Sequence, residues 1–327
     1  MKLGSLKSAT RDGQLIVVNR GLSHYLSAEK IAPSLQYALE NWQHCEPLLQ
    51  ALYETLTHHP DEGQALEQEQ LCAPLPRAYQ WLDGSAYLSH VQRVRKARGA
   101  EMPDSFLFDP LMYQGGSDHF LGPQDIICVA SEEDGIDFEA EVAIICDDVP
   151  MGTNGHSASE HIKLLMLVND VSLRQLIPGE LAKGFGFLHG KPPTAFSPVA
   201  VTLDELGAAW RDDRVHLPLI STYNGQLFGQ PNAGVDMQFS FAELLAHGAK
   251  TRALRAGSII GSGTVSNHNG AAGYSCLVEK RVLEIAASGV ASTEFMRFGD
   301  TIRIEMLDEQ GTSIFGAIEQ EVRSCKL

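Results

Sequence analysis

The stretch Gly-Ile-Asp-Phe-Glu-Ala-Glu-Val-Ala-Ile-Ile, residues 135–145, constrains the fold of this chain most strongly. Its apolar and acidic residues alternate with period two, which predicts a β-strand carrying Asp137, Glu139 and Glu141 on one face. The apolar continuation is typical of a core strand, and carboxylates on a buried face repel one another and lose hydration. Two interpretations follow: a solvated acidic edge strand, or a buried site for Mg²⁺, Ca²⁺ or Mn²⁺, which prefer oxygen ligands.

Length and charge narrow the class of protein. The 327 residues can form one large domain with a smaller companion. A net charge of −16 argues against nucleic acid and against an anionic membrane surface as partners. The sequence has no apolar run of transmembrane length and no signal-peptide core. We therefore expect a soluble cytoplasmic protein that binds neither nucleic acid nor membrane.

The six cysteines show no Cys-x-x-Cys pair and no Cys/His spacing typical of zinc sites. Several lie in apolar runs that predict strands. We therefore expect all of them to be buried free thiols in a reducing compartment. They are Cys45, Cys72, Cys128, Cys146, Cys276 and Cys325.

The pattern of elements predicts two domains, at residues 1–73 and 74–327. Strands are expected at residues 1–5 and 15–18, around a polar turn, followed by a helical region at 34–56 that breaks at Glu46-Pro47. The remainder reads as mostly strand with short helices. It includes an Asn224-Gly225 hairpin and helix starts of the capping-box type at Ser157, Thr202 and Ser240.

Residues 78–98 carry an acid and an imidazole at a suggestive spacing. Asp83 and His90 are seven residues apart, so on a helix they would share a face and could serve one site. The alternative is an ordinary surface helix. The basic residues that follow, Arg93, Arg95, Lys96 and Arg98, are typical of a solvated face.

Three further segments carry candidate functional residues. The apolar run 164–168 predicts a buried strand that ends near Asp170, a position where active-site residues often leave a scaffold. Lys191 lies in a rigid proline-containing loop. The Gly-Ser-Gly-Thr segment at 261–264 lacks the spacing of a nucleotide-binding loop, which favours binding of a small anion such as a carboxylate.

Together these segments resemble the fumarylacetoacetate hydrolase family over roughly residues 75–320. In that family an E-x-E pair on a strand binds a divalent metal, and Glu139 and Glu141 match it. An Asp in an N-D-x-S-x-R run is a further ligand, matched by Asp170. An upstream Asp with a His seven residues later, here Asp83 and His90, supplies the fourth ligand and the catalytic base.

The resemblance also implies other site residues. Glu279 would orient His90, and Lys191 and Arg174 would offset charge that develops on oxygen. The hydrolases carry a glutamine where this chain has Ile177, which leaves Gln175 as a candidate substitute, and a second tyrosine where it has Ser85. The implied substrate-binding residues are Tyr113, Arg98, Thr264, Gly263 and Gln175.

The fold implied by the resemblance is α+β and mostly β. A mixed β-sandwich roll forms the C-terminal domain, and a small α+β module precedes it. The family is commonly homodimeric. The implied member is a bacterial fumarylacetoacetase-like enzyme that hydrolyses a carbon–carbon bond in a β-diketo acid, with fumarylacetoacetate in tyrosine catabolism as the first candidate.

Other functions remain open on the same residues. Fumarylpyruvate or acylpyruvate hydrolases, 2-oxo acid decarboxylases and 2-keto-4-pentenoate hydratases share the metal-binding pattern, although His90 with Asp83 favours a hydrolase because it supplies a base for water. A serine hydrolase is disfavoured, since no G-x-S-x-G sequence occurs. A metal-stabilised binding protein without activity would keep the acids but would not need His90 or Lys191.

Overall fold

The computed structural model describes residues 1–97 and 101–325. Within these ranges the chain forms twenty strands and seven α-helices. The strands are β1 (Lys2–Leu6), β2 (Gln14–Val18), β3 (His24–Ser27), β4 (Gln64–Ala65), β5 (Trp81–Gly84), β6 (Met112–Gln114), β7 (Ile127–Val129), β8 (Ile136–Asp137), β9 (Ala140–Cys146), β10 (Ile162–Asn169), β11 (Ser172–Leu173), β12 (Ala195–Phe196), β13 (Ala200–Val201), β14 (Trp210–Arg211), β15 (Arg214–Val215), β16 (Ile220–Tyr223), β17 (Gln226–Gly229), β18 (Ile259–Gly261), β19 (Thr301–Glu305) and β20 (Ile318–Ser324). The helices are α1 (Leu35–Glu40), α2 (Trp42–His58), α3 (Leu88–Ala97), α4 (Gly155–Ala158), α5 (Ile177–Leu181), α6 (Phe241–Gly248) and α7 (Leu277–Ser288).

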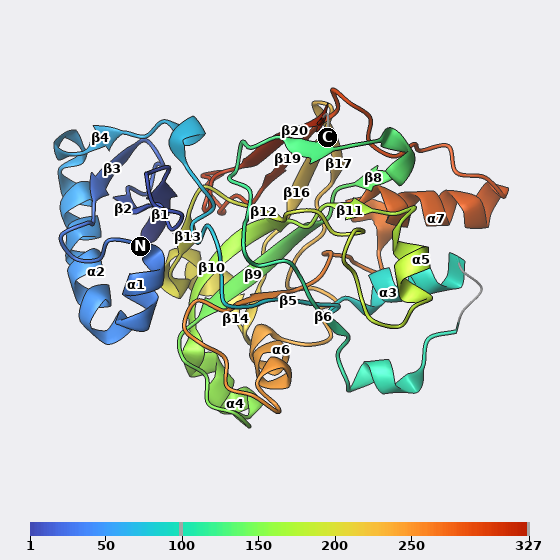
Figure 1. Ribbon diagram of the computed structural model, residues 1–327, viewed down its shortest axis with the longest axis horizontal. Helices are drawn as coiled ribbons and strands as arrows, with labels where there is room; N and C mark the ends of the chain where they lie inside the picture. Colours follow the sequence, from blue (N-terminus) through green and yellow to red (C-terminus); the bar gives the residue numbers. More distant parts are fainter. Residues whose placement is uncertain (98–100, 326–327) are drawn as a thin grey trace.

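One large mixed sheet runs through the molecule. Its strand order is β4-β3-β2-β1-β13-β10-β9-β18-β5-β6, and β12 pairs with β10 outside this path. All neighbours are antiparallel except β18 and β5, which run parallel. The helices α3, α5 and α7 gather beyond one end of this sheet, and α1 and α2 lie at the other (Figure 1). This mostly β, mixed architecture confirms the predicted fold class.

The first four strands extend the large sheet, because β1 pairs antiparallel with β13 through Lys2 and Val201. Helices α1 and α2 pack beside them (Figure 1). The predicted helix break at Glu46-Pro47 is wrong: the chain changes helix at Asn41, and Pro47 lies inside α2. Pro47 removes one backbone hydrogen bond from α2, and burial of Leu49 and Leu56 along the helix outweighs that loss.

A second sheet of five strands, in the order β17-β16-β19-β20-β7, packs against the large one. Its last pair is parallel and brings residues from the middle and the end of the chain together. Cys128 at this pair forms a disulfide with Cys325. The expectation that every cysteine is a free thiol is therefore wrong for these two, because the pairing depends on strand neighbours 197 residues apart in the sequence. The other four cysteines are free.

The central strands β9 and β10 are buried on both faces. On one face Val142, Ile144 and Leu165 belong to the core shared with the second sheet. On the other face Ile145 and Met166 pack with residues of α1 and α2. Polar side chains that emerge at the ends of these strands are therefore held on a rigid, water-excluding scaffold.

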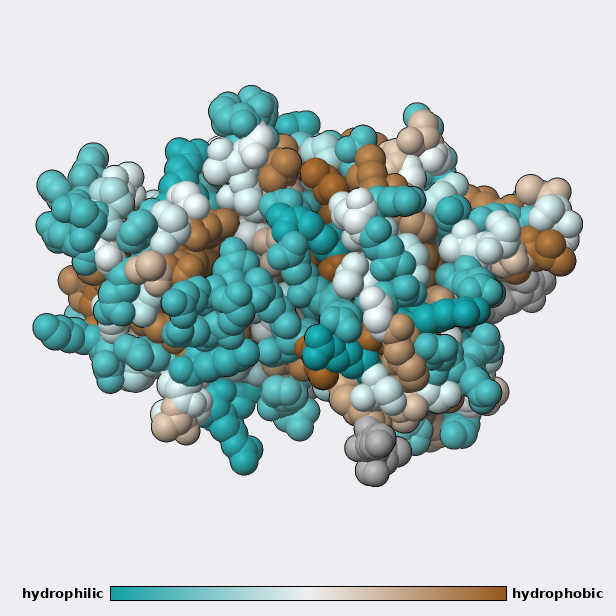
Figure 2. Space-filling view, turned by 90° about the horizontal axis from the view of Figure 1, so that it is seen from above, coloured by the Kyte–Doolittle hydropathy of each residue, from teal (hydrophilic) through white to brown (hydrophobic). Residues whose placement is uncertain are grey.

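The described surface is mainly hydrophilic on the face seen in Figure 2, with hydrophobic residues in separate patches. This agrees with the strong excess of acidic over basic residues. None of the helices in the described ranges has the length and apolar character needed to cross a membrane.

Candidate active site

Three carboxylates converge where the central strands end. Asp83 lies on β5, Glu141 on β9, and Asp170 directly after β10. One oxygen of each lies within 4.8 Å of the others, and all three residues are buried. Strand β18 lies between β5 and β9, with Gly261 paired to both Asp83 and Ala143. Sheet register therefore brings together residues that are far apart in sequence.

The predicted continuous acidic strand is interrupted. Asp137 belongs to β8, which pairs with β11, whereas Glu141 belongs to β9, and Glu139 lies in the connection between the two strands. The carboxylate of Asp137 accepts hydrogen bonds from the N–H groups of Leu277 and Val278, at 2.7 and 3.0 Å. Asp137 therefore holds the start of α7, where a negative charge is favoured, and does not join the carboxylate cluster.

Two cationic side chains bind the acids on one side of the cluster. Lys191 Nζ lies 2.6 Å from oxygens of both Glu139 and Asp170. Arg174 donates to Asp137 and Glu139 at 2.8 and 2.7 Å. Burial alone would raise the pKa of Glu139, but Arg174 and Lys191 outweigh it and hold that pKa well below its ordinary value. Glu139 is therefore ionised at neutral pH.

On the other side of the cluster, Glu141 has no such support. Both of its carboxylate oxygens are buried without a hydrogen-bond partner among the described residues. Burial, followed by the charges of Asp83 and Asp170, raises the pKa of Glu141 well above its usual range. Burial and Asp170 likewise raise the pKa of Asp83. Buried carboxylate oxygens that repel one another and lack hydrogen bonds are suitable ligands for a divalent cation. The cation would offset both the repulsion and the loss of hydration.

The loop after β18 explains how Asp83 is held. The N–H of Gly263 donates to Asp83 Oδ1 at 3.1 Å. A Cβ atom on Gly261 would lie 2.3 Å from the same oxygen, and one on Gly263 would lie 2.2 Å from the carbonyl of Gly84. Only glycine fits this close approach. The prediction that Asp83 and His90 share a helix is wrong, since Asp83 lies on β5 and His90 on α3.

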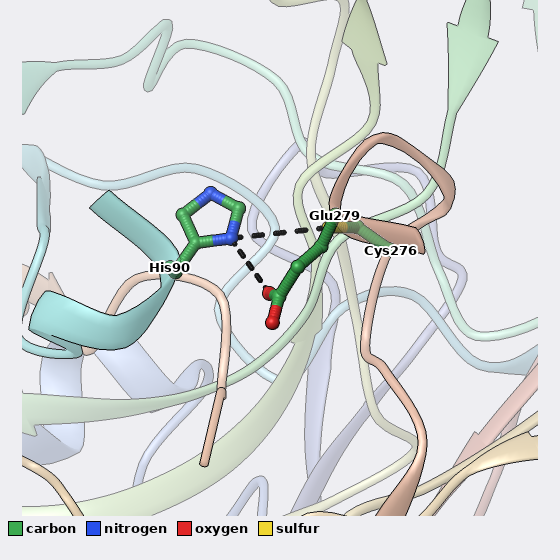
Figure 3. Close-up of side chains that lie close together, drawn as sticks. All are labelled: His90, Cys276 and Glu279. Carbon is green, nitrogen blue, oxygen red and sulfur yellow. Dashed lines mark hydrogen bonds and ion pairs between the residues drawn. The ribbon is translucent and has the colours of Figure 1, made fainter. Parts of the chain in front are cut away.

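His90 and Glu279 form a hydrogen-bonded pair across two helices. His90 Nδ1 lies 3.0 Å from Glu279 Oε2, and the glutamate side chain is almost fully buried (Figure 3). Burial alone would raise the pKa of Glu279, but its hydrogen bond to His90 and the charges of His90 and Arg93 lower it. An ionised carboxylate only accepts, so Nδ1 donates this hydrogen bond and Nε2 is the ring nitrogen left free of it.

Cys276 Sγ lies 4.0 Å from the same His90 nitrogen. Burial, followed by the charges of Asp137 and Glu279, raises the pKa of this thiol well above its ordinary value. A neutral thiol is a poor nucleophile. Cys276 therefore packs against the imidazole and is not a second nucleophile.

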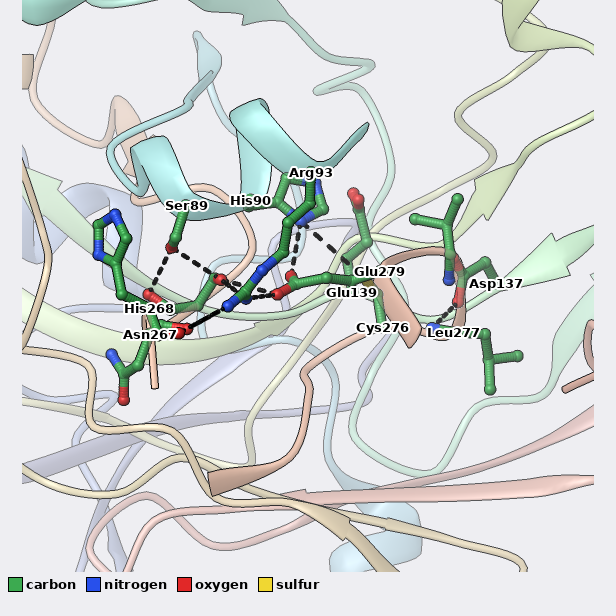
Figure 4. A network of polar contacts seen from close by, with 12 residues as sticks. Ser89, His90, Arg93, Asp137, Glu139, Asn267, His268, Cys276, Leu277 and Glu279 are labelled. Carbon is green, nitrogen blue, oxygen red and sulfur yellow. Dashed lines mark hydrogen bonds and ion pairs between the residues drawn. The ribbon is translucent and has the colours of Figure 1, made fainter. Parts of the chain in front are cut away.

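Arg93 completes the environment of Glu279, so the prediction that it lies on a solvated face is wrong. Its guanidinium bonds to Glu279 Oε1 and, at 3.1 Å, to Ser266 Oγ. It also donates to the carbonyls of Asn267 and His268, at 2.9 and 3.0 Å (Figure 4). Its position three residues after His90, on the same side of a helix, was the sequence signal that could have indicated this role.

We expect Arg93→Met to lower kcat about tenfold with KM nearly unchanged, because it removes a charge partner from the carboxylate that orients His90. The loss should grow as the pH falls, since the pKa of Glu279 would rise. In the native protein the pKa of Glu279 is lowered. Ionised Glu279 therefore contributes fully to the free energy of unfolding at any pH above the pKa that it has in the unfolded chain. This contribution is lost as the pH falls through its pKa in the folded protein.

Rate–pH profiles and melting temperatures of wild type, Arg93→Met and Arg93→Lys would test this. Gln92→Ala, on the exposed side of the same helix, is the control. Partial rescue by lysine is expected. An unchanged pH profile in Arg93→Met would show that Arg93 only anchors α3.

A pocket of about 250 Å³ is lined by His90, by Asp83 of the carboxylate cluster and by Glu139. Of the predicted substrate-binding residues, Tyr113, Gly263 and Thr264 line it, and Tyr113 also donates to Asp170 at 2.6 Å. Gln175 does not line it: this residue is exposed and its side chain lies beside Gly135. Arg98 lies outside the described residues.

Two hydroxyl groups that the sequence analysis did not single out also bind the acids. Thr194 Oγ1 donates to Asp170 at 2.8 Å, and Ser172 Oγ donates to Glu139 at 3.1 Å. Glu180 accepts the backbone N–H groups of residues 188–190, which fixes the loop before Lys191. Burial alone would lower the pKa of Lys191, but Asp170 and Glu139 raise it above its ordinary value, so the ammonium stays charged.

A buried cluster of acids, a paired lysine and a His–Glu pair lie close to one pocket, and the oxygen donors of the cluster are of the kind that divalent cations prefer. The model of the fumarylacetoacetate (FAA) hydrolase C-terminal domain matches residues 80–323, and the model of fumarylacetoacetase N-terminal domain 2 matches residues 1–77. The chain therefore belongs to the fumarylacetoacetate hydrolase family, whose members include hydrolases, isomerases and tautomerases.

The individual relatives share little sequence identity with this chain. Oxaloacetate tautomerase YisK of Bacillus subtilis is 26% identical over 251 residues, which cover 76% of this chain and 73% of that protein. A probable 2-hydroxyhepta-2,4-diene-1,7-dioate isomerase of Mycobacterium abscessus has a similar structure, with a TM-score of 0.69, 20% identity and full coverage of both chains.

A maleylpyruvate hydrolase of Sphingobium sp. SYK-6, solved with manganese(II) and pyruvate, matches over both full lengths with a TM-score of 0.66 and 14% identity. These structural likenesses establish the fold.

Proposed function

We propose that this protein hydrolyses a carbon–carbon bond in a β-diketo acid. The observation that carries the proposal is the His90–Glu279 pair, whose imidazole lines the same pocket as Asp83 and Glu139. A tautomerase or decarboxylase acting on a 2-oxo acid needs the charged cluster but does not need a base that activates water. A hydrolase needs both.

Asp83, Glu139, Glu141 and Asp170 would hold a divalent cation. Such an ion supplies Lewis-acid polarisation of the substrate oxygens when bound. The Sphingobium maleylpyruvate hydrolase, which has a similar fold, was solved in complex with manganese(II) and pyruvate, which supports a divalent cation in this protein. Mg²⁺, Ca²⁺ and Mn²⁺ all accept this donor set.

The residues of the chain then account for the proton movements. His90 takes a proton from water at Nε2, and the hydroxide oxygen forms a bond to the acyl carbonyl carbon. The bond from this carbon to the methylene carbon breaks, and its electron pair leaves as the enolate of a 2-oxo or 3-oxo acid. His90 returns the proton to that carbon, so one water is consumed and two acids are released.

Charge develops on oxygen during this step, and two cations of the chain lie beside it. Lys191 and Arg174 both line the pocket and stay protonated. Arg174 is held by Asp137 and Glu139 on one edge. A preorganised donor of this kind is worth about 3 kcal/mol in a transition state.

The assay follows the ultraviolet absorbance of the diketo chromophore in fumarylacetoacetate, fumarylpyruvate and acetylpyruvate, with Mg²⁺ or Mn²⁺ and with EDTA. We expect metal-dependent loss of the chromophore and release of the two acids in equal amounts. Oxaloacetate is assayed in parallel because of the tautomerase relative. Turnover of oxaloacetate with no cleavage of any diketo acid would overturn the hydrolase proposal and favour the tautomerase or decarboxylase alternative.

A further inference from the structure

The His90–Glu279 pair has a neighbour that the proposed reaction does not use, the thiol of Cys276. Its Sγ lies 4.0 Å from His90 Nδ1, and Glu279 Oε2 lies 3.0 Å from the same nitrogen (Figure 3). One potential ligand atom of each residue lies within 4.8 Å of the other two. A nitrogen, a sulfur and an oxygen thus gather in one place, although His90 and Cys276 are 186 positions apart in the sequence.

The fold holds these three side chains in place. Cys276 directly precedes α7 and Glu279 lies in its first turn. The carboxylate of Asp137 fixes this helix start by accepting two of its backbone N–H groups. Cys276 and Glu279 are almost fully buried, whereas His90 is partly exposed and lines the pocket. A metal ion in the pocket can therefore reach the group at His90.

The charges of the group suit a divalent cation. Arg93 and Ser266 bind the other oxygen of Glu279, Oε1, so Oε2 is the oxygen that faces the imidazole. A coordinated metal ion deprotonates a thiol. On binding, one proton would leave Cys276 for the solvent, and the thiolate and the carboxylate would then balance the two positive charges of the ion.

The spacing and the donor atoms favour zinc. Zn²⁺ binds cysteine sulfur at about 2.3 Å and histidine nitrogen or carboxylate oxygen at about 2.0–2.2 Å, in tetrahedral geometry. Neighbouring ligand atoms are then about 3.3–3.6 Å apart, and the separations of 3.0 and 4.0 Å lie on either side of that range. A soft thiolate ligand selects Zn²⁺ over Mg²⁺ and Ca²⁺, whereas the all-oxygen carboxylate cluster suits the harder ions.

We propose that His90, Cys276 and Glu279 form a second metal site, which binds Zn²⁺ and thereby inhibits the enzyme. A water molecule completes the four ligands of the ion. An imidazole whose Nδ1 binds a metal carries its remaining proton on Nε2, so His90 can no longer take a proton from water at that nitrogen. The inhibition rests on the proposed hydrolase function, whereas the binding of zinc does not.

Inhibition is measured on protein saturated with Mg²⁺, so that the carboxylate cluster is occupied. Cleavage of the diketo acid is followed as Zn²⁺ is added, and each protein is compared with its own rate without zinc. We expect Cys276→Ser to raise the zinc concentration for half-inhibition at least about 10-fold, because a ligand is lost. Cys72→Ser is the matched control: it removes a half-buried free thiol that lines a different pocket, and it should keep the wild-type sensitivity to zinc.

Titration with Co²⁺ in place of Zn²⁺ reports the ligands directly and needs no substrate. A thiolate bound to Co²⁺ gives a charge-transfer band in the near ultraviolet, and carboxylate ligands do not. With Mg²⁺ present, we expect this band in wild type and in Cys72→Ser, and its loss in Cys276→Ser. Cys276→Ala is a second replacement of the same thiol, and melting temperatures report that each variant is folded.

Three results would overturn the inference. Wild type could give no charge-transfer band, the band could be lost in Cys72→Ser, or zinc could inhibit wild type and Cys276→Ser equally, which would mean that it acts at the carboxylate cluster. Each of these leaves the hydrolase proposal intact, because cleavage without zinc is measured in the same experiment. Failure of wild type to cleave any diketo acid would instead remove the proposed function, and the Co²⁺ titration would still decide whether the site binds metal.

Discussion

Replacing His90 with alanine should lower kcat for diketo acid hydrolysis by about 10²- to 10⁴-fold, the usual contribution of a positioned general base. KM should change little, because the carboxylate cluster and the residues that line the pocket remain. His90→Ala also takes a hydrogen bond from the buried carboxylate of Glu279, so the melting temperature should fall modestly. Binding of a divalent cation should also persist.

Stopped-flow or steady-state absorbance with purified protein would measure this effect, with metal content determined for each sample. His156→Ala, at an exposed histidine of α4, is the matched control. Glu279→Gln should also lower kcat, because an amide does not stabilise the imidazolium that forms during proton transfer. If His90→Ala kept more than a tenth of the wild-type kcat, the base would have to be another group.

Removing the divalent cation should abolish activity and lower the melting temperature, because the cation compensates the buried charges of Asp83 and Glu141. At a cation concentration about 100 times Kd, binding is worth about 2.7 kcal/mol of stability. Differential scanning fluorimetry with EDTA and with added Mn²⁺ would measure the shift. An unchanged melting temperature, with metal removal verified by elemental analysis, would count against the metal site.

Glu141→Gln should change stability in opposite directions with and without metal. In metal-free protein it removes a buried carboxylate that has no hydrogen-bond partner among the described residues, so the melting temperature should rise or stay equal. With metal it removes a ligand, so the variant should gain less from Mn²⁺ than wild type. Glu133→Gln, at an exposed acid, is the control.

If Glu141→Gln lowered the melting temperature equally in metal-free protein and with Mn²⁺, Glu141 would be a structural residue and not a metal ligand. The comparison does not depend on any substrate. It therefore tests the cation site separately from the reaction.

Features that depend on neighbours in the sequence were predictable. The capping box of Ser240 with Glu243 forms as expected, and the Asn224-Gly225 turn joins β16 to β17. The strand at 164–168 is buried within β10. Each is set by side-chain periodicity or by hydrogen bonds within a few residues, so the sequence contains the necessary information.

Other predictions failed where a distant partner decides the outcome. Asp83 was assigned to a helix, but β5 pairs in parallel with β18, about 180 residues later in the chain. At Ser157 the predicted capping box does not form, because Asn154 caps a helix that begins at Gly155. The free-thiol expectation for Cys128 failed because β7 meets β20 only in the folded chain.

The sequence by itself determined the family, the fold class and the acids of the carboxylate cluster. Motif spacing and strand periodicity depend on residues that are close together in the sequence. Only the tertiary structure decided how these residues act together. Among the described residues it left the oxygens of Glu141 without hydrogen-bond partners, joined His90 to Glu279 across 189 positions, and placed Arg93 against the same glutamate. Charge pairing and desolvation depend on three-dimensional neighbours, and local pattern does not contain them.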